Sequence, residues 1–239
     1  MDRQQRIIQM FNDISPTYDR LNRILSFGID QRWRRNGCQA ALQAHGRSVR
    51  HLVDVATGTG DLILSWREAG RATGTDIHQA TGVDPARGML ELARRKVKNA
   101  GFMEAPATDL PLEDGAADML SISYGIRNVL DVDGALREFH RVLEPGGHLL
   151  ILEFMSPARP GPMDRLGRFY MSRVLPKVGA FISRDPEAYS YLPESIQGFL
   201  TSQALVEKLE AAGFAIVQVK DDTFGISTRF IAQRPKQAH

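Results

Sequence analysis

Short apolar runs alternate with amphipathic segments along most of the chain. The run His51–Ala56 is apolar, rich in strand-forming residues and followed closely by Gly58, which indicates a buried strand. The same criteria predict strands near Ala80–Asp84, Ala117–Tyr124 and His148–Phe154, and helices near Asp61–Ala69, Met89–Ala100 and Val132–Val142. Parallel strands need helical crossovers, so this alternation predicts an α/β fold with a largely parallel sheet.

The pattern changes at the two ends of the chain. The first fifty residues have the periodicity of helices with an exposed charged face. Residues 156–200 contain prolines at 157, 160, 162, 176, 186 and 193 and no clean strand, which predicts an inserted helical cap. A helix at Ser202–Ala212, ended by Gly213, and two strands, Phe214–Val219 and Thr223–Ala232, close the chain.

The composition excludes several classes of protein. A chain of 239 residues with 43% hydrophobic content can bury one core, so we expect one domain. Its 30 basic and 28 acidic residues give a net charge of +2 and no reason to expect nucleic acid as a partner. The single cysteine, Cys38, favours a reducing compartment. Without a signal-peptide pattern or a run of about 20 apolar residues, we expect a cytoplasmic protein, at most peripheral to a membrane.

Two glycines follow the first predicted strand, in Thr57-Gly58-Thr59-Gly60-Asp61. Glycines at the carboxyl end of a parallel strand let a ligand approach the backbone closely. Ile63 stands where a dinucleotide-binding fingerprint has its third glycine, which disfavours a pyrophosphate. Asp61 instead adds negative charge at a helix start, and this suits the cationic amino and sulfonium groups of S-adenosylmethionine.

Asp84 ends the next predicted strand. Its carboxylate can accept hydrogen bonds from both hydroxyls of a ribose. It lies thirty residues beyond Asp54, more than the usual ~20, and we attribute the difference to a long loop at Gly70–Gln79. Elsewhere in the chain, a turn is predicted at Glu144–Gly147, ahead of the strand at His148–Phe154. Asp84 and the glycine loop together predict an S-adenosylmethionine site at neighbouring strand ends.

Several motifs resemble those of the UbiE-like ubiquinone/menaquinone biosynthesis C-methyltransferases, a family of class I methyltransferases, and the resemblance covers nearly the whole chain. Met10–Asp19 with Leu21-Asn22, Leu25–Asp30 and Trp33-Arg34 is similar to the family's N-terminal lid motif. Tyr124–Val129 resembles its strand-four motif, and Tyr189–Ile196 resembles its cap signature. Leu143–Gly147 is common to many class I methyltransferases.

The resemblance implies a Rossmann-like, seven-stranded, mostly parallel sheet with its last strand reversed, helices on both faces and a helical cap insertion. It divides the single domain into an N-terminal helical lid (1–48), a cofactor-binding core (49–155), the helical cap (156–200) and a closing helix with strands (201–239). It also implies that Thr59, Asp84 and Ser123 contact S-adenosylmethionine. We add Gly58, Gly60 and Asp61 from the glycine loop, and we expect no metal.

Two positions depart from the family pattern. Where the family usually holds adenine with Asn or Asp followed by Ala, this chain has Pro106-Ala107, and proline offers neither a polar side chain nor an N–H. Asp109 or Thr108 could bind the adenine amino group instead, with Ala107 as a backbone contact. The chain also has Ser227–Phe230 where family members often end a strand in Ala-Leu-His. The identity of the acceptor ring therefore stays undetermined.

The resemblance implies S-adenosylmethionine-dependent C-methylation of a prenylated quinol, either demethylmenaquinol or a ubiquinol precursor. Arg127 would donate to the developing phenolate and Asn128 would orient a hydroxyl or a water. Tyr18 and Asp19 would close over the methyl donor, with Asp19 also a candidate proton acceptor. The residues alone also allow Arg127 in a surface ion pair, Asn128 as a helix cap and Tyr18 as an ordinary half-buried aromatic.

Other functions and partners remain open. The departure at Ser227–Phe230 leaves open a different aromatic or isoprenoid acceptor. The proline at position 106 leaves open a non-catalytic subunit with a methyltransferase fold. Met163–Ile182 mixes apolar and basic residues, so it is either a cap helix with a solvated face or a contact with the inner face of a membrane. The sequence does not decide between a monomer and a homodimer.

Overall fold

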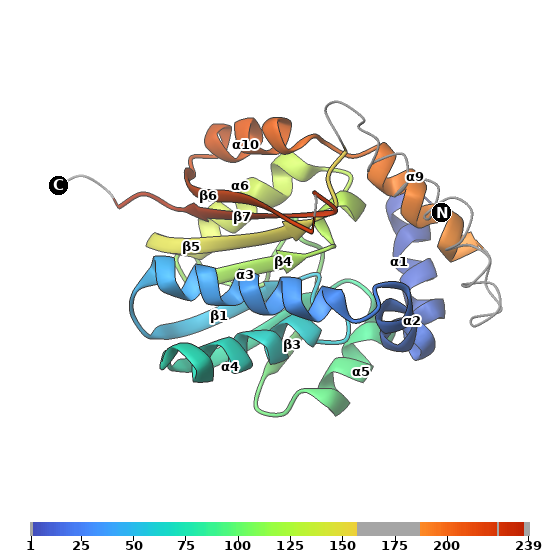
Figure 1. Cartoon of the computed structure of the whole chain (residues 1–239), viewed down its shortest axis with the longest axis horizontal. Coiled ribbons are helices and arrows are strands. Elements are labelled where there is room, and N and C mark those ends of the chain that lie inside the picture. The colour runs from blue at the N-terminus through green and yellow to red at the C-terminus, as the bar shows by residue number, and fades with distance from the viewer. Residues whose placement is uncertain (1, 157–186, 224, 237–239) are drawn as a thin grey trace.

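A seven-stranded sheet forms the centre of the computed structural model, which describes residues 2–156, 187–223 and 225–236 (Figure 1). The strand order in this described part is β3-β2-β1-β4-β5-β7-β6. Strands β1 to β5 pair in parallel, whereas β7 is antiparallel to both of its neighbours. The mostly parallel sheet with a reversed last strand is therefore confirmed. The strands are β1 (Val49–Val55), β2 (Ile77–Asp84), β3 (Gly101–Glu104), β4 (Ala117–Ser123), β5 (Leu143–Glu153), β6 (Ala215–Asp222) and β7 (Ser227–Gln233).

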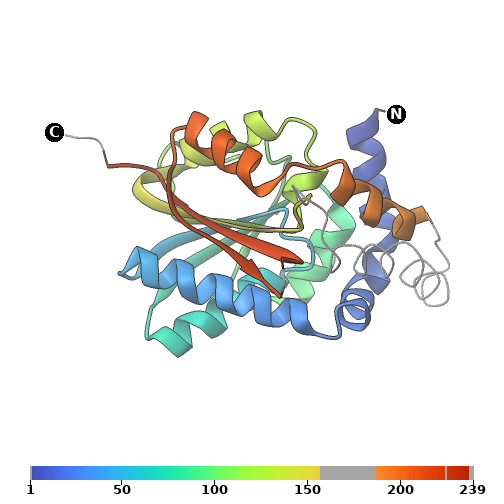
Figure 2. The same cartoon turned by 45° about the horizontal axis from the view of Figure 1, so that its top comes forward.

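Helices cover both faces of the sheet (Figures 1 and 2). On one face α3 (Ile29–His45) and α4 (Asp61–Thr73) bury Leu42 and Trp66. On the other, α6 (Val132–Val142) and α10 (Ser202–Ala211) bury Phe139 and Leu209 against β7. Helix α3 lies very close to β5, because a Cβ added at Gly37 would lie 2.9 Å from Leu152. A glycine at this position thus sets the distance between the helix and the sheet.

Four further elements gather at one end of the molecule (Figure 1). They are α1 (Arg3–Ile14), the 3-10 turn η1 (Ser15–Thr17), α2 (Tyr18–Leu25) and α9 (Glu187–Gln197). Asp2 and Gln5 form a capping box that begins α1. The helices predicted in the first fifty residues are confirmed, and α9 contains the whole motif at Tyr189–Ile196. The basic amphipathic segment Met163–Ile182 lies outside the described residues.

Two helical elements connect the strands near the site. Helix α5 (Arg87–Lys96) crosses from β2 to β3, and the 3-10 turn η2 (Ile126–Asn128) follows β4. Within the described residues, no helix combines the length and the apolar character that crossing a bilayer requires.

The sequence-based prediction was wrong at three places. The strand β3 was missed because it has only four residues, and its mostly exposed side chains form no apolar run. The expected loop at Gly70–Gln79 is the end of α4 and the start of β2, so longer elements account for the spacing between Asp54 and Asp84. Glu144–Gly147 belongs to an irregular start of β5, where the register shifts opposite Ala117–Met119.

Candidate active site

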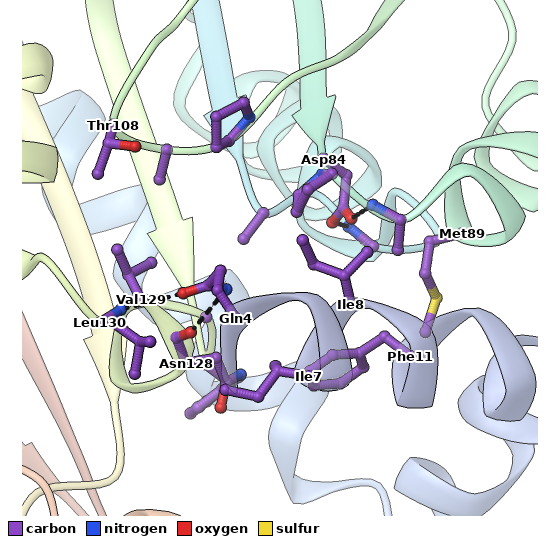
Figure 3. A pocket seen from close by; sticks show the side chains of 18 of the residues that line it. Gln4, Ile7, Ile8, Phe11, Asp84, Met89, Thr108, Asn128, Val129 and Leu130 are labelled. Carbon is purple, nitrogen blue, oxygen red and sulfur yellow. Dashed lines mark hydrogen bonds between the residues drawn. The ribbon is translucent and has the colours of Figure 1, made fainter. Parts of the chain in front are cut away.

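A cavity of about 280 Å³ lies where β1, β2 and β4 end. The pairing of Val55 with Val83 and Ile122 places these three strand ends side by side. Helix α1 forms the opposite wall (Figure 3). The residues that line the cavity include Gln4, Ile7, Ile8, Phe11, Tyr18, Gly58, Asp84, Met89, Pro106, Ala107, Thr108, Ser123, Asn128, Val129 and Leu130.

The carboxylate of Asp84 is fixed at the end of β2 by two backbone N–H groups. Its Oδ2 accepts from Gly58 and its Oδ1 from Ala86, each at 2.8 Å (Figure 3). Burial raises the pKa of Asp84 to about 6, although both N–H donors act in the opposite direction. A carboxylate oxygen can accept more than one hydrogen bond, so Asp84 can still bind the hydroxyls of a ligand.

The glycine loop leaves open space beside this carboxylate. Gly58 has a φ of +55°, and a Cβ added there would meet no atom within 4 Å. The cavity wall around it is largely apolar, with contributions from Ile8, Phe11 and Met89. A carboxylate for ribose hydroxyls next to apolar surface for a purine fits the nucleoside part of S-adenosylmethionine.

A buried hydrogen-bond network supports the loop from behind. Asp54 accepts from Thr57 at 2.6 Å and from Ser121 at 2.7 Å, and this ties the first loop residue to β4. Trp66 donates in turn to the Ser121 hydroxyl at 3.0 Å. Burial raises the pKa of Asp54 to about 7. Asp54 therefore sets the position of the loop without lining the cavity.

The structure separates the predicted donor contacts into two groups. Gly58, Asp84, Ala107 and Ser123 line the cavity of the described chain, together with Thr108. The others do not line it: Thr59, Gly60, Asp61 and Asp109. Asp109 is exposed on the surface.

Thr59 and Asp61 take part in a polar cluster around Lys96, the last residue of α5. The Lys96 ammonium lies 3.0 Å from the Thr59 hydroxyl and 2.6 Å from Asp19, and it forms an ion pair with Asp61. Thr59 also donates to Asp19 at 2.5 Å, while Arg23 lies 3.5 Å from Asp61. Burial alone would raise the pKa of Asp61, but Lys96 and the neighbouring arginines hold it below its ordinary value. The negative charge of Asp61 is thus compensated by protein cations.

A buried ion pair joins the strand-four motif to the end of β5. Arg127 binds Glu153 at 2.7 Å, and their side chains are 7% and 0% exposed. Arg127 also donates to the backbone carbonyl of Tyr124 at 2.6 Å. Burial raises the pKa of Glu153, and Arg127 counteracts part of that rise. The alternative of a surface ion pair for Arg127 is wrong, because the pair is buried. Arg127 is not among the residues that line the cavity.

Asn128 lines the cavity, and its side chain is held by helix α9 of the predicted cap insertion. Tyr191 of α9 donates from its hydroxyl to Asn128 Oδ1 at 2.9 Å. The alternative of a helix cap is wrong for Asn128, because Asp131 caps α6 by accepting from Gly134. The strand-four motif and α9 therefore meet at this side of the cavity.

The N-terminal helices contribute one predicted residue and several that sequence reasoning missed. Tyr18 lines the cavity and packs edge-on against Phe11, with ring centroids 6.2 Å apart. Gln4 donates to the carbonyl of Asn128 and accepts from the N–H of Leu130, both at 3.2 Å (Figure 3). Apolar residues at helical spacing, Ile7, Ile8 and Phe11, are the signal in the sequence that could have indicated this wall.

Comparisons with known proteins identify the family. The model of the ubiE/COQ5 methyltransferase family matches residues 1–234. A ubiquinone/menaquinone biosynthesis C-methyltransferase UbiE from Campylobacter jejuni is 44% identical, covering 98% of this chain and 100% of its own length. A demethylmenaquinone methyltransferase from Thermus thermophilus is also 44% identical, covering 95% of this chain and 100% of its own length.

Solved structures show the same fold at lower identity. A Thermotoga maritima protein described as a SAM-dependent methyltransferase has a TM-score of 0.62 and 19% identity, with 95% of this chain and 99% of that chain covered. The cyclase SpnF has a TM-score of 0.69 and 17% identity, with 98% and 96% covered. These similarities confirm the fold class predicted from the sequence motifs. The chain therefore belongs to the ubiE/COQ5 methyltransferase family and is an S-adenosylmethionine-dependent C-methyltransferase.

Proposed function

We propose that this chain methylates a ring carbon of a prenylated quinol, either demethylmenaquinol or a ubiquinol precursor. The observation that carries the proposal is a single cavity lined by the buried Asp84 carboxylate at the end of β2 and by the Asn128 amide in the turn after β4. The relatives named for ubiquinone and menaquinone biosynthesis cover nearly the full chain and support the choice of acceptor.

The donor end of the cavity consists of residues from three strand ends. Asp84 would accept from the ribose hydroxyls, Gly58 and Ser123 would lie beside the donor, and Ala107 with Thr108 would border the adenine. Thr59, Gly60 and Asp61 would hold the amino-acid end of the donor, which requires the Lys96 cluster to rearrange. In this proposal Asp109, exposed outside the cavity, has no part in donor binding.

The acceptor chemistry requires a reduced ring whose hydroxyl gives up a proton. S-adenosylmethionine supplies the methyl group when it is bound. Asn128, fixed by Tyr191, would orient the acceptor hydroxyl or a water that accepts its proton. In this structure Arg127 is bonded to Glu153 and to the Tyr124 carbonyl, so its contribution is to position the strand-four motif. Direct contact between Arg127 and a phenolate stays a prediction.

The N-terminal helices would act as a lid over this chemistry. We define the N-terminal lid as α1, η1 and α2, whose Phe11 and Tyr18 lie at the cavity. Closing them would exclude water and hold donor and acceptor in line, an arrangement that can supply ~7 kcal/mol or more. The ion pair between Asp19 and Lys96 would keep the lid closed, while the contacts of Thr59 and Asp61 with this cluster give way to the donor. A prenylated acceptor also requires peripheral contact with a membrane surface.

The test is direct transfer from labelled donor. The full chain would be incubated with labelled S-adenosylmethionine and, separately, with demethylmenaquinol and a demethylated ubiquinol precursor, and products would be identified by mass. Labelled methyl on a ring carbon of either quinol supports the proposal. Transfer to neither contradicts it, provided that calorimetry shows the donor bound. Absence of donor binding would instead favour a non-catalytic subunit, the reading that Pro106 leaves open.

One observation favours a different aromatic or isoprenoid acceptor as the second candidate. Ser227 of the altered C-terminal strand lies 3.1 Å from the hydroxyl of Tyr124, the first residue of the strand-four motif. The departure from the family pattern thus contacts the strand-four motif, which this proposal assigns to the acceptor side of the site. Transfer to a simpler phenol or isoprenoid with no transfer to a quinol would support this candidate.

A further inference from the structure

The turn between α2 and α3 presents an aromatic side chain to solvent from a strained backbone. Phe27 is 86% exposed and has a φ of +51°. This left-handed conformation costs a residue with a side chain about 1 kcal/mol or more, whereas asparagine adopts it more readily. Neither the strain nor the exposed ring contributes to the stability of the isolated chain. Phe27 therefore points to a contact outside the chain.

Basic side chains share the surface around Phe27. Arg20, Arg23 and Ile24 are exposed, and their spacing i, i+3 and i+4 places them on one face of α2, which ends two residues before Phe27. Arg32 is exposed near the start of α3. We call these five residues the α2–α3 tip.

Acidic side chains near the tip do not cancel its charge. Asp30 is buried and forms its ion pair with Arg34, which is also buried. Asp61 lies 3.5 Å from Arg23 but is ion-paired with Lys96 as well. The tip thus presents apolar and cationic groups together, a combination that matches the boundary between anionic headgroups and acyl chains.

The tip lies near the cavity but not in it. Tyr18 lines the cavity at the start of α2, and at about 1.5 Å of rise per residue the other end of this helix, which leads into Phe27, lies ~10 Å further along the helix axis. Helix α2 lies at the end of the molecule where α1 and α9 gather (Figure 1). A helix in the interface is buried about 5–10 Å deep, so insertion of the tip would bring the lid side of the cavity close to the membrane surface.

We propose that the α2–α3 tip inserts into an anionic membrane surface, with Phe27 and Ile24 at the acyl boundary and the three arginines at the phosphates. The value of such docking rests on the proposed function, because a prenylated acceptor resides in the bilayer. The binding itself requires no quinol, so it can be measured separately from transfer.

The test is co-sedimentation of the full chain with vesicles of phosphatidylcholine alone or mixed with phosphatidylglycerol. Phe27→Asn removes the ring at a position that suits asparagine, so we expect an unchanged or higher melting temperature and about tenfold weaker binding to mixed vesicles. The double variant Arg20→Gln/Arg32→Gln should bind mixed vesicles about thirtyfold more weakly at low salt, at ~1 kcal/mol for each arginine. Matched controls are Val217→Asn, an exposed apolar site on β6, and Arg71→Gln, an exposed arginine on α4.

Each outcome decides the proposal. Parent binding to mixed vesicles that both tip variants lose and both controls keep supports it. Parent-like binding by the tip variants, or no binding by the parent, overturns it, as does binding only to an acidic protein partner. A water-soluble acceptor separates this result from the proposed function: Phe27→Asn should methylate it at the parent rate and lose rate only on vesicle-embedded acceptor. If the parent methylates neither acceptor, the proposed function fails while the vesicle result stands.

Discussion

The side-chain ammonium of Lys96 lies 2.6 Å from a carboxylate oxygen of Asp19, which joins the end of α5 to the start of α2. The same ammonium contacts Thr59, next to Gly58 in the glycine loop. One lysine therefore connects the crossover helix, the glycine loop and the N-terminal lid. The side chains of Lys96, Asp19 and Asp61 are partly buried, so the ion pair between Lys96 and Asp19 should influence how firmly the lid is held.

Replacing Lys96 with glutamine should loosen the lid. The lost ion pair with Asp19 of the lid is worth about 1 kcal/mol, so the ratio of closed to open lid should fall by up to about fivefold and the Kd for S-adenosylmethionine should rise by no more than that factor. Calorimetry measures the Kd, and limited proteolysis of α1 and α2 reports lid opening. Lys98→Gln, an exposed lysine on the same segment, is the control. Parent-like affinity and parent-like proteolysis in Lys96→Gln would contradict the role.

Replacing Asp84 with asparagine should cripple donor binding. An amide would direct its NH₂ group at one of the two backbone N–H donors, from Gly58 or Ala86, and would lose the charge that strengthens both ribose hydrogen bonds. We expect the Kd for S-adenosylmethionine to rise about a hundredfold, equivalent to about 3 kcal/mol. Asp109→Asn, exposed and outside the cavity, should keep the parent Kd. Equal affinity in Asp84→Asn and the parent would remove the ribose assignment.

The affinity for the donor should also depend on pH. The pKa of Asp84 is raised from its ordinary 3.8 to about 6, so its neutral form accumulates in the folded protein as the pH falls below about 6. Donor hydroxyls bind the carboxylate better than the neutral acid, so affinity should be constant above about pH 7. It should fall below pH 6 by at most about tenfold per pH unit. Titration calorimetry from pH 8 to pH 5 measures this slope, and a similar slope in Asp84→Asn would assign it to another group.

The sequence was informative wherever a buried strand led into a turn. Strands β1 and β4 are buried on both faces along most of their length, and β2 is buried from Ala80 to Asp84. Their parallel arrangement requires Gly58, Asp84 and Ser123 to meet at one edge. Strand β3 has no such run and was missed. The donor side of the cavity thus follows from local patterns and parallel topology.

The remaining wall could not be predicted, because it depends on packing between distant segments. Gln4 reaches the backbone of Asn128 and Leu130 only because α1 lies across the strand ends, an orientation that no periodicity encodes. Similarly, the negative charge of Asp61 predicted a cationic ligand, but the sequence could not show that the ammonium of Lys96 in α5 pairs with it.

Variants of the buried pair of Arg127 and Glu153 should distinguish its effect on stability from its effect on methyl transfer. Replacing Arg127 with methionine leaves the fully buried Glu153 without its cation, and we expect a loss of about 3 kcal/mol in the free energy of unfolding by urea. The double variant Arg127→Met/Glu153→Met removes both charges and should recover most of that loss. Arg47→Met is the control, because Arg47 pairs with Glu144 at an exposed site and should change stability by less than about 1 kcal/mol.

Methyl transfer should not recover with stability. The double variant lacks the guanidinium that binds the Tyr124 carbonyl, so Asn128 should be held less firmly in the cavity and single-turnover transfer should stay slow. Donor affinity should remain at the parent value, because Arg127 does not line the cavity. Recovery of both stability and transfer in the double variant would show that Arg127 only neutralises Glu153, since Asn128 would then be held well enough for transfer without the guanidinium.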